Sequence, residues 1–242
     1  MLKKAACLFA ILLTTLFLLP ITAAGEVALR GYTKADGYQY VAMGLYPQTT
    51  EEEGILPILW RVLSVEDGEA LLFSEYILGN GRIHHDDVEY IANGGAWNTT
   101  DRFVFLNDTF LQERFTEAEQ SLMLESEELG TIFLLSGEEV KNAAYGLGTD
   151  KERRGVGTPY ALANGLYHYS GANSKYSPYW TRSQSTTANY GARCTKYEGN
   201  LGYIRVVVEN LGWRPALRID LNKAIPIGGL GTMDDPLILG VR

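Results

Sequence analysis

The side chains most able to do chemistry in this chain are His84, His85, Asp86 and Asp87, with Glu89 close behind. Imidazole nitrogens and carboxylate oxygens are zinc ligands, and a zinc ion needs three or four of them converging on one point. Adjacent residues rarely converge unless the loop folds back, and further ligands would have to come from elsewhere in the chain. We therefore predict a solvated polar loop without a metal ion, and keep a metal site as the alternative.

The thiol of Cys194 is the second group that could react. It lies in a strand-like stretch, where most cysteines behave as small buried hydrophobes, so we predict an inert thiol over a reactive one. The sequence shows no Ser-His-Asp order, phosphate-binding loop or His-Glu-x-x-His helix. The neighbouring Glu138 and Glu139 fit the start of a helix better than an acid/base pair. We predict no catalytic residue and no cofactor.

Tryptophan and arginine recur together, as Trp180 with Arg182 and as Trp213 with Arg214. Side chains alternate across a strand, so Trp180 and Arg182 should share one face. An arginine over an indole ring gains roughly 0.5–2 kcal/mol, and its aliphatic stem packs well. We interpret these pairs as internal bracing of the fold, with contact to a ligand as the alternative.

Residues 146–175 lack clear periodicity and are rich in glycine, asparagine and tyrosine. An irregular stretch of this length inside a domain is often functional. Tyrosine combines a flat apolar face with a hydrogen-bonding tip, which suits recognition of carbohydrate or protein. The alternative is a glycine-rich loop whose tyrosines cover the core. The predicted ligand-binding residues are Tyr160, Tyr167, His168, Tyr169, Asn173 and Tyr176.

The N-terminal residues and the net charge of the chain indicate its cellular location and limit its partners. Lys3 and Lys4 precede an apolar run over residues 5–19, with small residues near position 24. This is the layout of a secretory signal peptide, and the run is shorter than the roughly 20 residues that span a bilayer. We predict that residues 1–24 are a signal peptide, that residues 25–242 form one secreted or periplasmic domain, and that no stable membrane span remains. The net charge of −8 argues against a nucleic-acid partner.

The expected elements are strands at both ends of the chain and helices between them. Strands are predicted at residues 38–43, 58–65 and 70–74, with an Asp67-Gly68 hairpin turn between the last two. A short helix over residues 100–106 should end near Asn107. Capping boxes at residues 116–119 and 136–139 predict two more helices, the second ending at Gly146. Further strands are expected at residues 179–183, 191–196, 203–208 and 213–219. This order predicts an α+β fold with mixed or antiparallel sheets, two or three short helices and a long irregular region.

Several short motifs occur together along residues 40–240. In this order they resemble a bacterial, often secreted, family of domains of unknown function that is related to the C-type lectin-like fold. Their structural signature residues are Trp60, Arg61, Trp97, Trp180, Arg182, Trp213 and Arg214. The motifs are G-x-Y-P-Q at residues 44–48, P-I-x-W-R-V-L at 57–63, W-x-x-[ST]…R…L-N…F at 97–110, F-[ST]-x-x-E at 115–119, a W-x-R-S strand at 180–183, G-V-R-P-A-L-like residues at 212–217, and G-x-G-T-x-x-D-P at 229–236.

The resemblance implies a scaffold and leaves the activity open. C-type lectin-like proteins include glycan binders, receptor-recognition domains and formylglycine-generating oxidases, so the fold alone does not select a function. The Glu-Pro-Asn or Gln-Pro-Asp tripeptide of calcium-dependent sugar sites does not occur here, and Trp97-Asn98-Thr99 lacks the acidic third residue of its Trp-Asn-Asp partner. The oxidases use a cysteine pair, whereas only Cys194 remains after residue 24. We expect a recognition module for a glycan or a cell-surface protein, with an enzyme of altered chemistry or a structural accessory module as alternatives.

Overall fold

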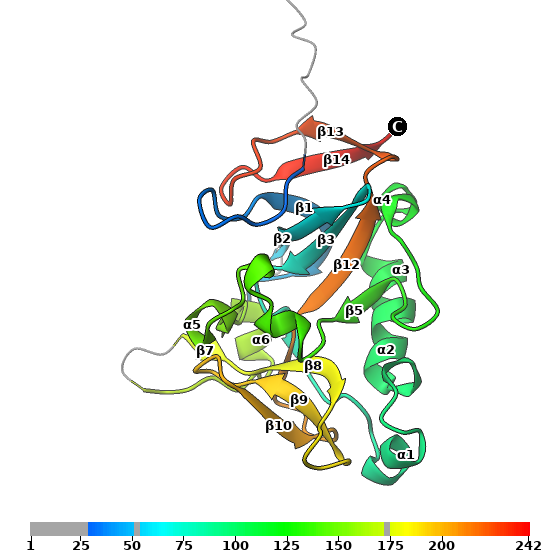
Figure 1. The fold of residues 1–242 in the computed structure, drawn as a ribbon, viewed down its shortest axis with the longest axis vertical. Coiled ribbons are helices and arrows are strands. Elements are labelled where there is room, and N and C mark those ends of the chain that lie inside the picture. Colours follow the sequence, from blue (N-terminus) through cyan, green and yellow to red (C-terminus); the bar gives the residue numbers. More distant parts are fainter. Residues whose placement is uncertain (1–28, 51–53, 172–174) are drawn as a thin grey trace, which may run out of the picture.

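Two larger β-sheets, a two-stranded ribbon and a set of short helices make up the described part of the chain (Figure 1). The computed structural model describes residues 29–50, 54–171 and 175–242. The predicted signal peptide, residues 1–24, and the predicted site residue Asn173 lie outside these ranges. Within them, every helix is too short or too polar to cross a membrane. The α+β class expected from the sequence is confirmed, with sheets that are mostly antiparallel.

The first sheet has seven strands in the order β13-β14-β1-β2-β3-β12-β5. Its pairs are antiparallel except β1 with β14, which run parallel. The β2–β3 turn is the predicted one: Asp67 and Gly68 have φ angles of 51° and 81°, as a two-residue type I′ turn requires. The strands are β1 (Tyr40–Pro47), β2 (Ile55–Glu66), β3 (Glu69–Ser74), β5 (Ile132–Leu134), β12 (Pro215–Asp220), β13 (Ala224–Gly228) and β14 (Leu237–Val241).

The second sheet has five strands in the order β10-β9-β8-β11-β4, and a two-stranded ribbon lies beside it. Figure 1 shows this sheet below the first, with β8, β9 and β10 in yellow and orange. The pairing of β11 with β8 is parallel and the other pairs are antiparallel. The strands are β4 (Gly79–Asn80), β8 (Tyr179–Gln184), β9 (Gly191–Thr195), β10 (Leu201–Arg205) and β11 (Gly212–Trp213), with the ribbon made of β6 (Gly155–Val156) and β7 (Tyr176–Ser177).

Helices α1 to α4 lie along one side of both sheets in Figure 1. The described residues contain six short α-helices, more than the two or three predicted, because several are single turns. The helices are α1 (Asp87–Ala92), α2 (Asp101–Phe105), α3 (Leu111–Arg114), α4 (Glu117–Leu122), α5 (Asp150–Arg153) and α6 (Pro159–Ala163), with 3₁₀ turns at Trp97–Thr99, Glu139–Lys141 and Ala143–Tyr145 and a π-helical turn at Leu106–Phe110.

An aromatic cluster joins the two sheets to the helices. The Trp213 ring of β11 lies 5.5 Å from Tyr46 of β1 and 5.2 Å from Phe110 of the π-helical turn, both edge to face. Tyr46 and Phe110 are also in edge contact, at 5.4 Å. Edge-to-face pairs of this kind add about 0.5–1.5 kcal/mol beyond area burial. The core is thus continuous from the first sheet to the second.

The helix predicted to end near Asn107 does not end there. Thr100 caps α2, and the chain continues through the π-helical turn into α3. The Asn107 amide does not terminate the helix because it bonds to strand β5: Nδ2 donates to the Ile132 carbonyl at 2.9 Å, and Oδ1 accepts from Thr131 and Ile132 N–H groups. The sequence could not show this partner, which lies 25 residues away.

The second predicted capping box forms its two hydrogen bonds but opens no α-helix. Ser136 N–H donates to the Glu139 carboxylate at 2.6 Å, and Glu139 N–H donates to the Ser136 hydroxyl at 3.1 Å. Two 3₁₀ turns follow, separated by Asn142, whose side chain accepts from the Ala144 N–H. The predicted end at Gly146 holds, since this residue adopts a left-handed φ of 68°. The predicted α-helix over these residues was wrong.

The predicted single strand over residues 213–219 is two strands in different sheets. Trp213 ends β11, and Pro215 begins β12 in the other sheet. Proline has no N–H to give to a ladder, so the first position of a strand suits it. Arg214 sits at this crossing and is buried.

Candidate functional site

The predicted tyrosine region is divided into an exposed surface and a pocket wall. Tyr167 and Tyr169 are 44% and 41% exposed, and Tyr169 stacks on Tyr197 with ring centroids 4.5 Å apart and planes 2° apart. Tyr197, which sequence reasoning missed, lies in the turn between β9 and β10. We call Tyr167, Tyr169 and Tyr197 the tyrosine surface. The pKa of Tyr197 is raised, chiefly by its hydrogen bond with Glu198, with smaller effects of desolvation and the nearby phenols.

Helix α5 holds the β9–β10 turn that carries Tyr197. The buried Arg153 donates from Nε to the Gly199 carbonyl at 2.8 Å, and Arg154 donates from Nε to the Glu198 carbonyl at 3.0 Å. Gly199 has a φ of 96°, and a Cβ there would lie 1.6 Å from the Asp150 carbonyl oxygen. Only glycine fits this close approach. The β9–β10 turn is therefore held by hydrogen bonds to its backbone carbonyls and by its close packing against Asp150.

Residues 150–153, inside the region expected to be irregular, form α5, and a capping box of Thr149 with Glu152 begins it. The T-x-x-E pattern at residues 149–152 was the available signal. A second missed helix, α6, begins with Thr158 as N-cap and Pro159 in its first turn, which is also a recognisable start. The region expected to be irregular thus carries two short helices.

The remaining predicted residues of this region have different surroundings. Tyr176 of β7 is half-buried, with the Arg154 guanidinium 5.2 Å from its ring centroid. His168 is exposed between the two surface tyrosines. Tyr160 of α6 is half-buried, and its ring contacts Tyr46 edge to face at 5.9 Å.

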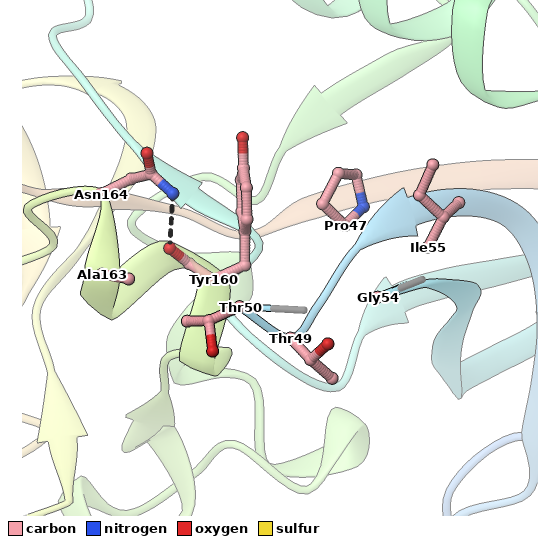
Figure 2. Close-up of a pocket in the computed structure, with 8 residues that line it drawn as sticks. All are labelled: Pro47, Thr49, Thr50, Gly54, Ile55, Tyr160, Ala163 and Asn164. Atoms are coloured by element: carbon pink, nitrogen blue, oxygen red, sulfur yellow. Dashed lines mark hydrogen bonds between the residues drawn. The ribbon is translucent and has the colours of Figure 1, made fainter. Parts of the chain in front are cut away.

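Tyr160 instead lines a shallow pocket between α6 and the β1–β2 connection (Figure 2). The pocket has a volume of about 370 Å³. The Tyr160 N–H donates to the Gln48 carbonyl at 3.2 Å, and Asn164 Nδ2 donates to the Tyr160 carbonyl at 2.8 Å. Figure 2 shows the described lining residues, none of which carries a charge: Pro47, Thr49, Thr50, Gly54, Ile55, Tyr160, Ala163 and Asn164. These described residues offer few groups for catalysis.

The signature tryptophans and arginines lie inside the fold. All are buried except Arg182, which is half-buried. The indole N–H groups donate to backbone carbonyls: Trp60 to Met43 at 2.8 Å, Trp97 to Leu129 at 3.1 Å and Trp180 to Gly81 at 2.7 Å. These contacts join strands and helices that are distant in sequence, as bracing requires.

The arginines use partners other than the tryptophans beside them. Arg182 donates to the Leu134 carbonyl at 2.7 Å, pairs with Glu139, and lies over the Phe133 ring. The β8 ladder shifts between Trp180 and Gln184, so simple alternation does not run through this stretch.

The other two signature arginines, Arg61 and Arg214, bond to residues in or just after strand β3 of the first sheet. Arg61 forms a two-bond pair with Glu75, at 2.7 and 2.6 Å. Arg214 donates to the Ser74 carbonyl at 2.7 Å and lies 4.0 Å from the Phe73 ring centroid. Burial, together with the charge of Arg61, lowers the pKa of Arg214 to about 10. Arg214 therefore remains charged at neutral pH.

The histidine segment is not the fully solvated loop predicted from the sequence. His84 is buried, with its side chain 3% exposed, and both imidazoles turn toward Glu89 of α1 and Asp101 of α2. The premise that adjacent residues do not converge fails here because Asp86 caps α1 by accepting from the Glu89 N–H. That turn brings Glu89 back to the imidazoles. A hydrogen bond with Asp101 raises the pKa of the exposed His85.

Cys194 is buried in β9, opposite Trp180 of β8 and Gly202 of β10. Burial raises the pKa of this thiol to about 11. A thiol with that pKa is almost wholly protonated at neutral pH, and the thiolate is the reactive form.

The described residues together make an α+β protein with an exposed aromatic surface and a compact histidine–carboxylate cluster. A family model described as a domain of unknown function, DUF6273, matches residues 67–221, and the chain belongs to this family. No curated protein and no solved structure matches the chain. The matched segment contains both the tyrosine surface and the histidines. The motifs at residues 44–48, 57–63 and 229–236 lie outside it, so the match is narrower than the expected residues 40–240.

Proposed function

We propose that this protein is a non-catalytic recognition module that binds a glycan on the tyrosine surface without calcium. One observation carries the proposal: the stacked Tyr169–Tyr197 pair, with parallel rings, stands at the surface beside the exposed Tyr167. Flat apolar rings with hydroxyl tips suit the faces and hydroxyl groups of sugar rings. Ordering such a surface on binding would cost little, because α5 already fixes the turn beneath Tyr197.

The buried state of Cys194 favours recognition over thiol chemistry. A thiol enclosed by β8 and β10, with a pKa of about 11, is poorly suited to the nucleophilic or redox step of an oxidase-like enzyme. The pocket at Tyr160 also lacks a charged group among its described lining residues. A cell-surface protein is the alternative ligand, and the test below distinguishes it from a glycan.

We also propose that the chain is exported and that its domain is related to the C-type lectin-like fold. Export rests on the basic and apolar character of residues 3–19. The fold relationship rests on the motifs at residues 57–63, 180–183 and 212–217. Mass spectrometry of protein recovered from the producing cells tests the first, since a mature chain beginning near residue 25 is expected. An experimental structure compared with lectin-like domains tests the second.

The test of binding is a glycan and cell-wall-fragment array, followed by calorimetry on any ligand that saturates, in calcium and in chelator. Tyr169→Ala and Tyr197→Ala should each weaken binding about 10-fold or more, as removal of a central aromatic contact does. Tyr190→Ala is the matched control, because Tyr190 is 40% exposed and lies in a different loop. Binding should be equal in both buffers.

Two results would contradict the proposal. Equal losses in all three variants would remove the tyrosine surface as the site. Absence of saturable binding to every glycan and wall fragment would reject the glycan ligand, and a protein partner crosslinked at Tyr169 would then replace it.

A further inference from the structure

Three side chains near the start of α1 bring ligand atoms together at one point. One atom each from His84, His85 and Glu89 lies within 4.8 Å of the others. The Glu89 carboxylate lies 3.7 Å from His84 Nε2 and 3.2 Å from His85 Nε2. Two ligands of a tetrahedral zinc ion, each at 2.0–2.1 Å, are about 3.3 Å apart. These two spacings, the first to Oε1 and the second to Oε2 of Glu89, lie on either side of that value.

A second observation points independently to a ligand. His84 is buried, and its Nε2 atom has no hydrogen-bond partner within the described residues. A buried polar atom left without a partner costs roughly 1–3 kcal/mol, so such atoms call for an explanation. This atom faces Glu89, where a metal ion would satisfy it.

Asp101 stands on the opposite side of both imidazoles. Its carboxylate lies 3.1 Å from His84 Nδ1 and 3.0 Å from His85 Nδ1. A carboxylate at the second nitrogen is the usual support of a metal-bound histidine, since it keeps the proton on Nδ1 and frees Nε2. The backbone N–H of Asp101 also lies 3.3 Å from His84 Nδ1, and the metal-bound tautomer would exchange that contact for the carboxylate.

We propose that His84 Nε2, His85 Nε2 and the Glu89 carboxylate bind one divalent cation of the zinc class, with Asp101 as the supporting carboxylate. Two imidazoles favour zinc and similar transition metals over calcium, which takes oxygen ligands. The side chains of His85 and Glu89 are about half exposed, at 48% and 52%. The fourth position of the ion therefore faces solvent and is open to water or to a ligand. The proposal does not depend on glycan binding.

The experiment is calorimetric titration of the full chain, stripped of metal, with zinc chloride alone and in the presence of calcium. One zinc ion per chain should bind, and calcium should not compete. At a free concentration 100 times Kd, zinc should raise Tm by about 5–10 °C. Long-range ¹H–¹⁵N spectra of the imidazoles should show His84 and His85 as Nδ1-protonated, Nε2-bound rings.

Variants of the exposed ligands identify the site without threatening the fold. His85→Ala and Glu89→Gln should each weaken zinc binding about 100-fold, and Asp101→Asn about 10-fold. His168→Ala is the matched control, because His168 is an exposed histidine outside the cluster and should leave binding unchanged. Absence of stoichiometric zinc binding would overturn the proposal. Unchanged binding in His85→Ala and Glu89→Gln, or an equal loss in His168→Ala, would overturn it as well.

Discussion

Replacing Trp180 with alanine distinguishes internal bracing from ligand contact at the W-x-R-S motif. Trp180 lies in β8, is 1% exposed, and donates its indole N–H to the Gly81 carbonyl at 2.7 Å. A buried aromatic side chain of 150–250 Å² contributes about 4–6 kcal/mol at 25 cal/mol per Å². Measured tryptophan-to-alanine changes cost about 3–5 kcal/mol. The Gly81 carbonyl would also lose its partner.

We therefore expect Trp180→Ala to lower the free energy of unfolding by about 4–5 kcal/mol. For a chain of this size each kcal/mol moves Tm by about 2–4 °C, so a fall of about 8–20 °C is expected. Urea and thermal unfolding, followed by circular dichroism, measure both quantities. Trp180→Phe is the matched variant: it keeps most of the apolar area while removing the donor, whose loss costs about 1–3 kcal/mol.

A small change in Tm would refute this reasoning. If Trp180→Ala unfolds within about 2 °C of the unsubstituted protein and has lost glycan binding, Trp180 is a ligand contact and the bracing interpretation is wrong. Equal costs for the alanine and phenylalanine variants would show that the hydrogen bond to Gly81, rather than packing, sets the stability.

Three further predictions concern the Arg182–Glu139 ion pair, the thiol of Cys194 and the hydrogen bonds of Asn107. Burial alone would raise the pKa of Glu139, but the hydrogen bond and charge of Arg182 outweigh it and lower that pKa. The stabilisation is therefore present above the unfolded pKa of about 4.5 and is lost as pH falls through the lower folded value. Glu139→Gln should cost about 1–3 kcal/mol at pH 7, and the difference in Tm should shrink as pH falls below the unfolded pKa of about 4.5; a pH-independent difference contradicts the ion pair. Cys194 should react with a thiol reagent at pH 8 at least about 1,000-fold more slowly in the folded than in the unfolded chain, and rapid native labelling would show an accessible thiol. Asn107→Leu removes four hydrogen bonds to Phe103, Thr131 and Ile132 and should cost about 2–4 kcal/mol in urea unfolding, whereas a neutral result would mean that water replaces them.

Elements with strong local signals could be predicted, and those that depend on distant partners could not. The Asp67-Gly68 turn and the Thr116 capping box follow from residues within four positions of each other, and both are present. The end of the helix at Asn107 was misplaced because its amide, besides donating to Phe103 in the same helix, bonds to Thr131 and Ile132. The break at Arg214 was missed because both of its flanks are strand-like, and only the sheets on either side separate them.

The candidate sites show the same division. Tyrosine content drew attention to Tyr167 and Tyr169, but their partner Tyr197 comes from a turn 28 residues beyond Tyr169, outside the region expected to be irregular. The histidines were recognised as ligand types. Their convergence required the first turn of α1 and the position of Asp101 in α2. Residue types could be identified locally, whereas distances between them could not.

The sequence by itself determined the α+β class, the turns, the helix caps and the family, because these depend on residue type and short spacing. Tertiary structure alone decided which side chains meet: Tyr169 with Tyr197, and His84 with Glu89 and Asp101. The physical reason is that local propensities act through the backbone of a few neighbouring residues. Contacts between distant residues depend instead on how two sheets and their helices pack into one core.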